Sequence, residues 1–144
     1  MFDVFGEFDS MEELNMAAEG QRKQGDKESF LNLAKENGID EYEAELYWSG
    51  QTSVLVDYFS AAVGKLEIEK ANIKSRMPVA PIVDFLSSSC LEESFARIIR
   101  SKVKNLNDCI DLVYKKCQEE CKKSGGYVAD MTVFNWAREY YTEV

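Results

Sequence analysis

Residues 53–74 read SVLVDYFSAAVGKLEIEKANIK and repeat apolar side chains at a helical spacing. Positions three, four or seven apart lie on one face of a helix, and those positions here are Leu55, Phe59, Ala62, Leu66 and Ile73. Three more apolar residues widen this face: Tyr58, Val63 and Ile68. The stretch therefore predicts a long helix from Ser53 to about Lys74 that lies at the centre of the fold.

Three short helices are predicted before this stretch. A capping residue precedes each of them, and a glycine ends each; the caps are Ser10, Asp26 and Asp40, and the glycines are Gly25, Gly38 and Gly50. Ser10 and Glu13 also fit a capping box, in which the glutamate reaches back to the cap. The predicted helices cover residues 11–24, the segment from 27 to Gly38, and residues 41–48.

The rest of the chain also predicts helices. The prolines of 77–81 end the central helix, and Pro81 opens a short helix that reaches Ser88. A further helix is expected over 91–99, then one over 106–123 capped by Asn105 and one capped by Asp130 that reaches Tyr141. The buried face expected for helix 106–123 is Leu106, Cys109, Ile110, Val113, Cys117 and Cys121. We thus expect an all-α fold: one compact domain, residues 1–144, with seven or eight helices around one core.

The net charge is confined to the first third of the chain. Residues 1–50 carry thirteen acids and four bases, a net charge of −9, whereas residues 51–144 carry thirteen of each. An acidic end on a neutral body is typical of a protein that meets a basic partner, and a soluble, solvated surface is the alternative. Such a charge gives no reason to bind bare nucleic acid or an anionic membrane.

The composition argues against most catalytic and metal sites. The chain has no histidine, which removes the commonest general base and metal ligand. Its four cysteines do not follow the spacing of structural zinc sites, so we interpret them as reduced thiols in the core. No calcium-loop pattern is present, and nothing singles out a catalytic pair among twenty-six acids. We therefore expect no enzyme activity, no cofactor and no metal.

The start of the chain does not resemble a signal peptide, since Phe2 and Asp3 follow Met1. No run approaches the length of apolar residues that a membrane span requires. The expected location is the cytoplasm.

Four acids and two tryptophans are the candidate partner-binding residues: Asp40, Glu41, Glu43, Glu45, Trp48 and Trp136. The acids at the start of helix 41–48 also stabilise the helix by interacting with its dipole, so a solvated face that binds no partner remains an alternative. Glu41 and Glu45, four apart, repel each other, which favours a basic partner. Tryptophan is favoured at interfaces, whereas Phe134 and Tyr141 are expected in the core.

A basic strip lies in the neutral part of the chain: Arg97, Arg100, Lys102 and Lys104, then Lys115, Lys116, Lys122 and Lys123. It could contact phosphate, as in a DNA-binding regulator. Because residues 51–144 are neutral overall, we expect this strip to pair with local acids such as Glu119 and Glu120.

The C-terminal segments resemble the PcfK-like family of mobile genetic elements. The similar segments are KNLNDCI at 104–110, GGYVAD at 125–130, VFNWA at 133–137 and YY at 140–141. In the N-terminal part, FGEFDS at 5–10 and ENGID at 36–40 resemble the branch that includes anti-CRISPR inhibitors of Cas9. The resemblance covers most of the chain and implies a function without catalytic residues, in the bacterial cell.

The resemblance implies that the protein binds and inhibits Cas9, with or without guide RNA. The charge pattern adds that an acidic surface, imitating DNA, could occupy a positively charged nucleic-acid channel of that nuclease. The alternative is an accessory protein of a conjugative or other mobile element that binds another protein. The oligomeric state stays open, and a homo-oligomer is among the alternatives.

Overall fold

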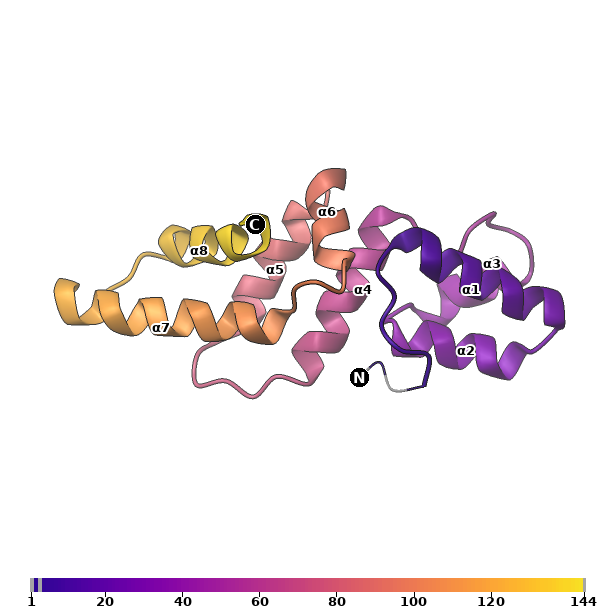
Figure 1. Ribbon diagram of the computed structural model, residues 1–144, viewed down its shortest axis with the longest axis horizontal. Helices are drawn as coiled ribbons and strands as arrows, with labels where there is room; N and C mark the ends of the chain where they lie inside the picture. Colours follow the sequence, from indigo (N-terminus) through magenta and orange to yellow (C-terminus); the bar gives the residue numbers. More distant parts are fainter. Residues whose placement is uncertain (1, 3, 144) are drawn as a thin grey trace.

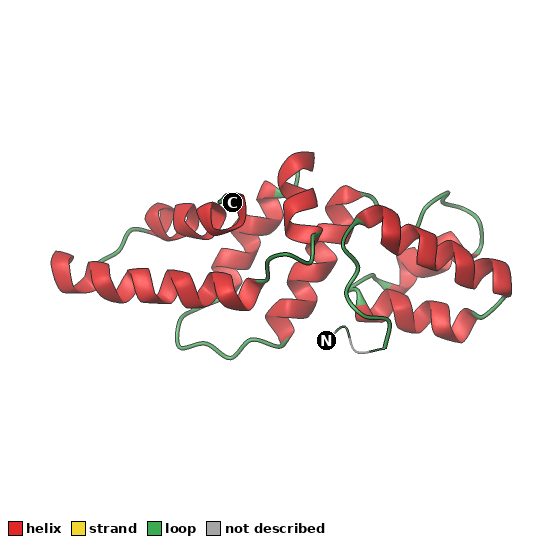
Figure 2. Ribbon diagram, in the orientation of Figure 1, coloured by secondary structure: helices red, strands yellow, loops and turns green. Residues whose placement is uncertain are grey.

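The computed structural model describes residue 2 and residues 4–143, and these form eight α-helices without a strand (Figures 1 and 2). The predicted all-α fold is therefore confirmed. The helices are α1 (Met11–Gln24), α2 (Lys27–Glu36), α3 (Glu41–Trp48), α4 (Tyr58–Ala71), α5 (Ala80–Ser89), α6 (Glu93–Arg100), α7 (Leu106–Ser124) and α8 (Asp130–Thr142). None of them is both long enough and apolar enough to cross a bilayer, as far as the described residues show.

The short helices of the first third begin where the capping residues predict. Ser10 Oγ accepts a hydrogen bond from the Glu13 N–H at 3.2 Å, so it caps α1. The Glu13 carboxylate reaches one residue further than a capping box requires, and accepts from the Asp9 N–H at 2.7 Å. Asp26 and Asp40 cap α2 and α3 in the same way. Local hydrogen bonding to the first free N–H groups thus sets these starts.

The predicted start of the central helix at Ser53 is wrong, because α4 begins at Tyr58. Asp57 and Ser60 form a capping box there, with the Ser60 N–H 2.7 Å from the Asp57 carboxylate. Residues 51–57 form a loop whose Val56 peptide group is held by the Asn15 amide, at 3.0 Å to the N–H and 2.9 Å to the C=O. A contact with a residue distant in sequence therefore replaces the first helical turn.

Three later boundaries also differ from the prediction, and the first of these is the end of α4, which lies at Ala71 rather than near Lys74. Ala129, in extended backbone, is the residue before α8, and Asp130 is the first helical residue rather than the cap. Its negative charge still favours the helix N-terminus. Helix α6 begins at Glu93, so Leu91 lies in the preceding turn and is 71% exposed.

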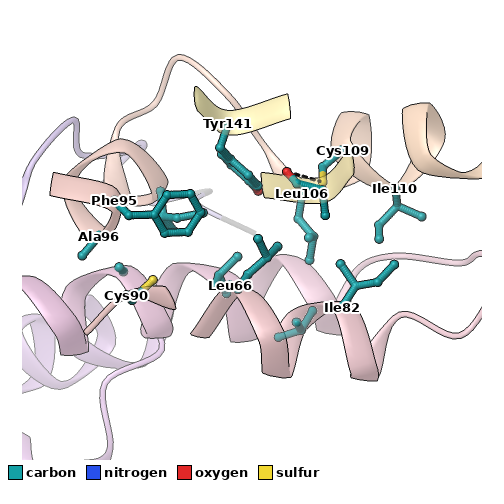
Figure 3. Packing of buried hydrophobic residues seen from close by; sticks show 14 of the residues in the cluster. Leu66, Ile82, Cys90, Phe95, Ala96, Leu106, Cys109, Ile110 and Tyr141 are labelled. Carbon is teal, nitrogen blue, oxygen red and sulfur yellow. Dashed lines mark hydrogen bonds between the residues drawn. The ribbon is translucent and has the colours of Figure 1, made fainter. Parts of the chain in front are cut away.

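The buried apolar side chains form two clusters, where the sequence predicted one core. The N-terminal cluster comprises Leu14, Ala18, Phe30, Leu33, Ala34, Ile39, Ala44, Tyr47, Leu55, Val56 and Ala61. The C-terminal cluster comprises Ala62, Leu66, Ile82, Val83, Leu86, Cys90, Phe95, Ala96, Ile99, Leu106, Cys109, Ile110, Val113, Ala137 and Tyr141 (Figure 3). Helix α4 contributes to both, because it is apolar on more than one face.

The helices form an elongated molecule in which α4 connects two ends (Figure 1). Helices α1 to α3 lie at one end, and α7 and α8 lie side by side at the other. Cys117 and Cys121 are half-buried on α7 rather than fully buried, and so is Phe134 on α8. The acidic third of the sequence therefore occupies one end of the molecule.

Candidate functional site

The four candidate acids lie at the start of α3 and along it, but they have different surroundings. The Asp40 carboxylate accepts from the Tyr42 N–H at 2.7 Å and thereby caps the helix. Glu45 is half-buried and forms an ion pair with Lys27 at 3.1 Å. Glu41 and Glu43 are exposed and form no ion pair within the described chain. No described basic side chain lies within ion-pair distance of either carboxylate, although Lys35 lines the same small pocket as Glu41.

The two tryptophans lie far from each other and are both half-buried. Trp48 packs on the N-terminal cluster, with its ring centroid 5.2 Å from that of Phe30. Trp136 lies on α8 at the opposite end of the molecule, with the Lys116 ammonium 5.8 Å from its ring centroid (Figure 1). The structure thus groups Trp48 with the acids of α3 and separates Trp136 from them.

A groove of about 820 Å³ runs between the start of α3, the loop 51–57 and α4. Its apolar lining residues are Ile39, Leu46, Val54, Leu55, Val56, Phe59 and Val63. Asp40, Glu43 and Asp57 are its acidic lining residues, and it has no lysine or arginine. We call this feature the acidic groove. It combines an apolar surface with three negative charges, which suits a cationic partner that also carries apolar side chains.

The sequence interpretation identified Asp40 and Glu43 but missed the loop wall of the acidic groove. The sequence predicts residues 53–57 within the central helix, whereas in the structure they precede α4 and form one wall of the acidic groove. One signal in the sequence does indicate the later start, since Asp57 and Ser60 have the spacing of a helix cap.

Glu7 and Asp9, which precede α1, form contacts inside the molecule. We call residues 4–9 the N-terminal strap. Glu7 forms an ion pair with Lys65 at 2.9 Å, and the Phe8 carbonyl accepts from Arg100 at 2.5 Å. The Asp9 carboxylate accepts from the Lys102 N–H at 3.0 Å, which lowers the Asp9 pKa. The strap therefore ties the acidic end to α4, to the last residue of α6 and to the segment that follows it.

Within the described chain, Arg97 is the one member of the basic strip that forms an ion pair, and it pairs both with the distant Glu12 and, at 3.5 Å, with Glu93 one helical turn away. Arg97 pairs with Glu12 at 2.7 Å, and this hydrogen bond lowers the pKa of the Glu12 carboxyl. The described ion pairs include none from Glu119 or Glu120. The Glu7–Lys65 and Glu12–Arg97 pairs thus cancel part of the charge separation in space, whereas Glu28, Glu41 and Glu43 stay exposed without an ion pair to any described residue.

Three charged side chains are buried where α4 meets the segment 100–106. The Lys65 ammonium is fully buried and donates to the carbonyls of Ser101 and Lys104, at 2.5 and 3.0 Å. Glu69 accepts from the Leu106 N–H at 3.2 Å, and burial raises its pKa. Burial also lowers the pKa of the Arg100 guanidinium. Lys65 and Glu69 thus hold the chain crossing between α6 and α7, whereas Arg100 donates to the Phe8 carbonyl.

The cysteines lie in the C-terminal part of the molecule. Cys90 and Cys109 are buried, and burial raises the pKa of each thiol to about 12. The Cys109 thiol donates a weak hydrogen bond to the Ala137 carbonyl at 3.7 Å (Figure 3). Among the described residues, no three acidic, cysteine or histidine side chains converge as metal ligands.

The chain was also compared with known proteins. No protein-family model matches it, and no curated protein or solved structure matches it either.

Proposed function

We propose that this protein binds and inhibits a Cas9-type RNA-guided nuclease, with the acidic end around α3 as its binding surface. The C-terminal and N-terminal segments that resemble the PcfK-like family support the choice of partner. The protein acts by binding, without catalysis or a cofactor, in the cytoplasm of a bacterial cell that holds the nuclease.

The observation that carries this proposal is the exposed charge of Glu41 and Glu43, which form no ion pair with any described residue. Within the described chain, Glu7, Asp9 and Glu12 form contacts with the basic residues or peptide groups of 65–102, whereas the acids of α3 have only Lys27 as a partner. Cas9 holds nucleic acid in positively charged channels. An acidic surface accelerates encounter with such a channel and disfavours binding to nucleic acid itself.

The test is DNA cleavage by a purified Cas9–guide complex in the presence of the protein, preceded by a pull-down with the same complex. The variant Glu41→Lys/Glu43→Lys should weaken inhibition about tenfold, because four units of charge at a rim contribute roughly 1–2 kcal/mol. Inhibition by the wild type should also weaken as salt rises.

The matched control is Glu67→Lys/Glu119→Lys, which changes two exposed acids outside the acidic groove and has the same net charge. It should inhibit nearly as well as the wild type. Equal inhibition by both double variants would show that the α3 surface is not the binding surface. A protein that neither binds nor inhibits Cas9 would support the alternative, an accessory protein of a mobile element.

A further inference from the structure

We infer that the acidic groove holds one segment of the partner in which lysine or arginine side chains lie beside apolar ones. This inference rests on the proposed function and specifies which chemistry the partner presents. A cationic amphipathic helix is the simplest segment of this kind, since it places an apolar stripe and a charged stripe side by side.

The surface of the acidic groove can receive apolar side chains. Phe59, Val63 and Leu46 are only half-buried, and Val54 is 48% exposed at the loop wall. The volume of about 820 Å³ falls within the range of roughly 300–1,000 Å³ that is typical of ligand clefts. Several side chains of one segment fit such a space, and their burial would remove the exposed apolar area from water.

The charges of the acidic groove select a cation. Asp40 and Asp57 each use one carboxylate oxygen to cap a helix, through the N–H groups of Tyr42 and Ser60. Their other oxygens accept no hydrogen bond within the described chain. Because the caps hold both carboxylates in place, a lysine or arginine can pair with them without further ordering of these side chains. Glu43 adds a third charge, and no lining residue supplies a cation.

The loop wall offers main-chain partners as well. The N–H and C=O groups of Ser53, Val54 and Leu55 make no hydrogen bond to any described residue. The neighbouring Val56 peptide group is held by Asn15, which fixes the end of this wall. Polar side chains of a bound segment can therefore bond to the wall while its apolar side chains contact α4.

The experiment measures binding of two synthetic amphipathic helical peptides by fluorescence anisotropy. One peptide consists of leucine and lysine, and the other has glutamate in place of each lysine. The wild type should bind the lysine peptide and not the glutamate peptide. Glu43→Lys should lower the affinity for the lysine peptide about tenfold, whereas Glu67→Lys, with the same net charge, should lower it much less.

A second matched pair tests the apolar contribution. Val54→Ser removes an exposed valine from the loop wall, and Val103→Ser removes one that is 80% exposed outside the acidic groove. Only Val54→Ser should weaken binding of the lysine peptide, by about threefold or more. Neither position is buried, so both variants should stay folded.

The outcomes separate this inference from the proposed function. Equal loss of peptide affinity in Glu43→Lys and Glu67→Lys would show attraction by net charge alone and would overturn the inference, even if Cas9 inhibition still depends on Glu41 and Glu43. Peptide binding that follows the groove variants, together with no inhibition of Cas9, would support the inference and overturn the proposed function.

Discussion

Replacing Gly64 with alanine should destabilise the protein, although alanine is the better helix former. Gly64 lies on α4, and a Cβ atom there would be 2.4 Å from the Asn37 carbonyl oxygen. The opposing Gly38 has a φ of +72°, and a Cβ atom there would be 2.3 Å from the Gly64 carbonyl oxygen. The turn between α2 and α3 thus contacts α4 through two glycines, backbone against backbone.

The expected magnitude follows from this contact. Glycine to alanine inside a helix stabilises by about 1 kcal/mol when nothing else changes. At position 64 the backbones must separate by about 1 Å to reach ordinary contact. The obstacle is the main-chain carbonyl of the buried Asn37, and it cannot rotate away as a side chain would. Overpacking of this kind costs roughly 1–3 kcal/mol, and the separation also opens the N-terminal cluster, so we expect a net loss of about 1–2 kcal/mol.

The matched control is Gly20→Ala on α1, where a new Cβ atom would meet nothing within 4 Å. It should stabilise by about 0.5–1 kcal/mol. The assay is urea unfolding followed by circular dichroism, with both variants and the wild type in one buffer. If Gly64→Ala raises the free energy of unfolding as much as Gly20→Ala does, the close approach of the α2–α3 turn to α4 is wrong.

Three further predictions concern the strap, the C-terminal cluster and the thiols. Asp9→Asn should lower the melting temperature near neutral pH, because the native pKa of Asp9 lies below the ordinary 3.8 and the charged form therefore stabilises the fold. The difference in melting temperature between variant and wild type should vanish as the pH falls through that native pKa, and melting curves across the acid range will show whether it does. Phe134→Ala should lower the free energy of unfolding by about 2 kcal/mol, measured by urea unfolding. This is less than the loss for a fully buried phenylalanine, because Phe134 is half-buried, with its ring centroid 4.8 Å from that of Phe85. A loss below about 0.5 kcal/mol would contradict this stacking. Iodoacetamide at mildly alkaline pH should modify only Cys117 and Cys121 in the folded protein, since Cys90 and Cys109 are buried with pKa values of about 12. Mass spectrometry should find all four cysteines modified after unfolding, and early labelling of Cys90 would refute the packing.

The sequence predicts most helix boundaries because their signals are local. A cap bonds to N–H groups two or three residues away, and a glycine that ends a helix acts on the same turn. The starts of α1, α2, α3 and α7 therefore agree with the prediction. The start of α4 does not, because an apolar periodicity that continues through Leu55 also fits residues buried in a loop.

The candidate site shows the same difference between features that local sequence signals predict and features that depend on tertiary contacts. Position in the sequence was enough to place Asp40, Glu41, Glu43 and Glu45 together, since all four lie on one short helix or at its cap. It could not show that Glu45 meets Lys27, or that the loop 51–57 leaves a groove beside Glu43. Trp136, chosen for its residue type, lies at the other end of the molecule.

The sequence by itself determined the helical class, the helix ends with local caps, and the location of excess negative charge in residues 1–50. Only the tertiary structure decided which of those charges remain available. Glu12 and Arg97 are 85 positions apart, and Asp9 and Lys102 are 93 apart, yet each pair is in contact. Such pairings depend on how the two clusters pack around α4. Coulomb interactions follow distance in space, whereas the sequence records only order along the chain.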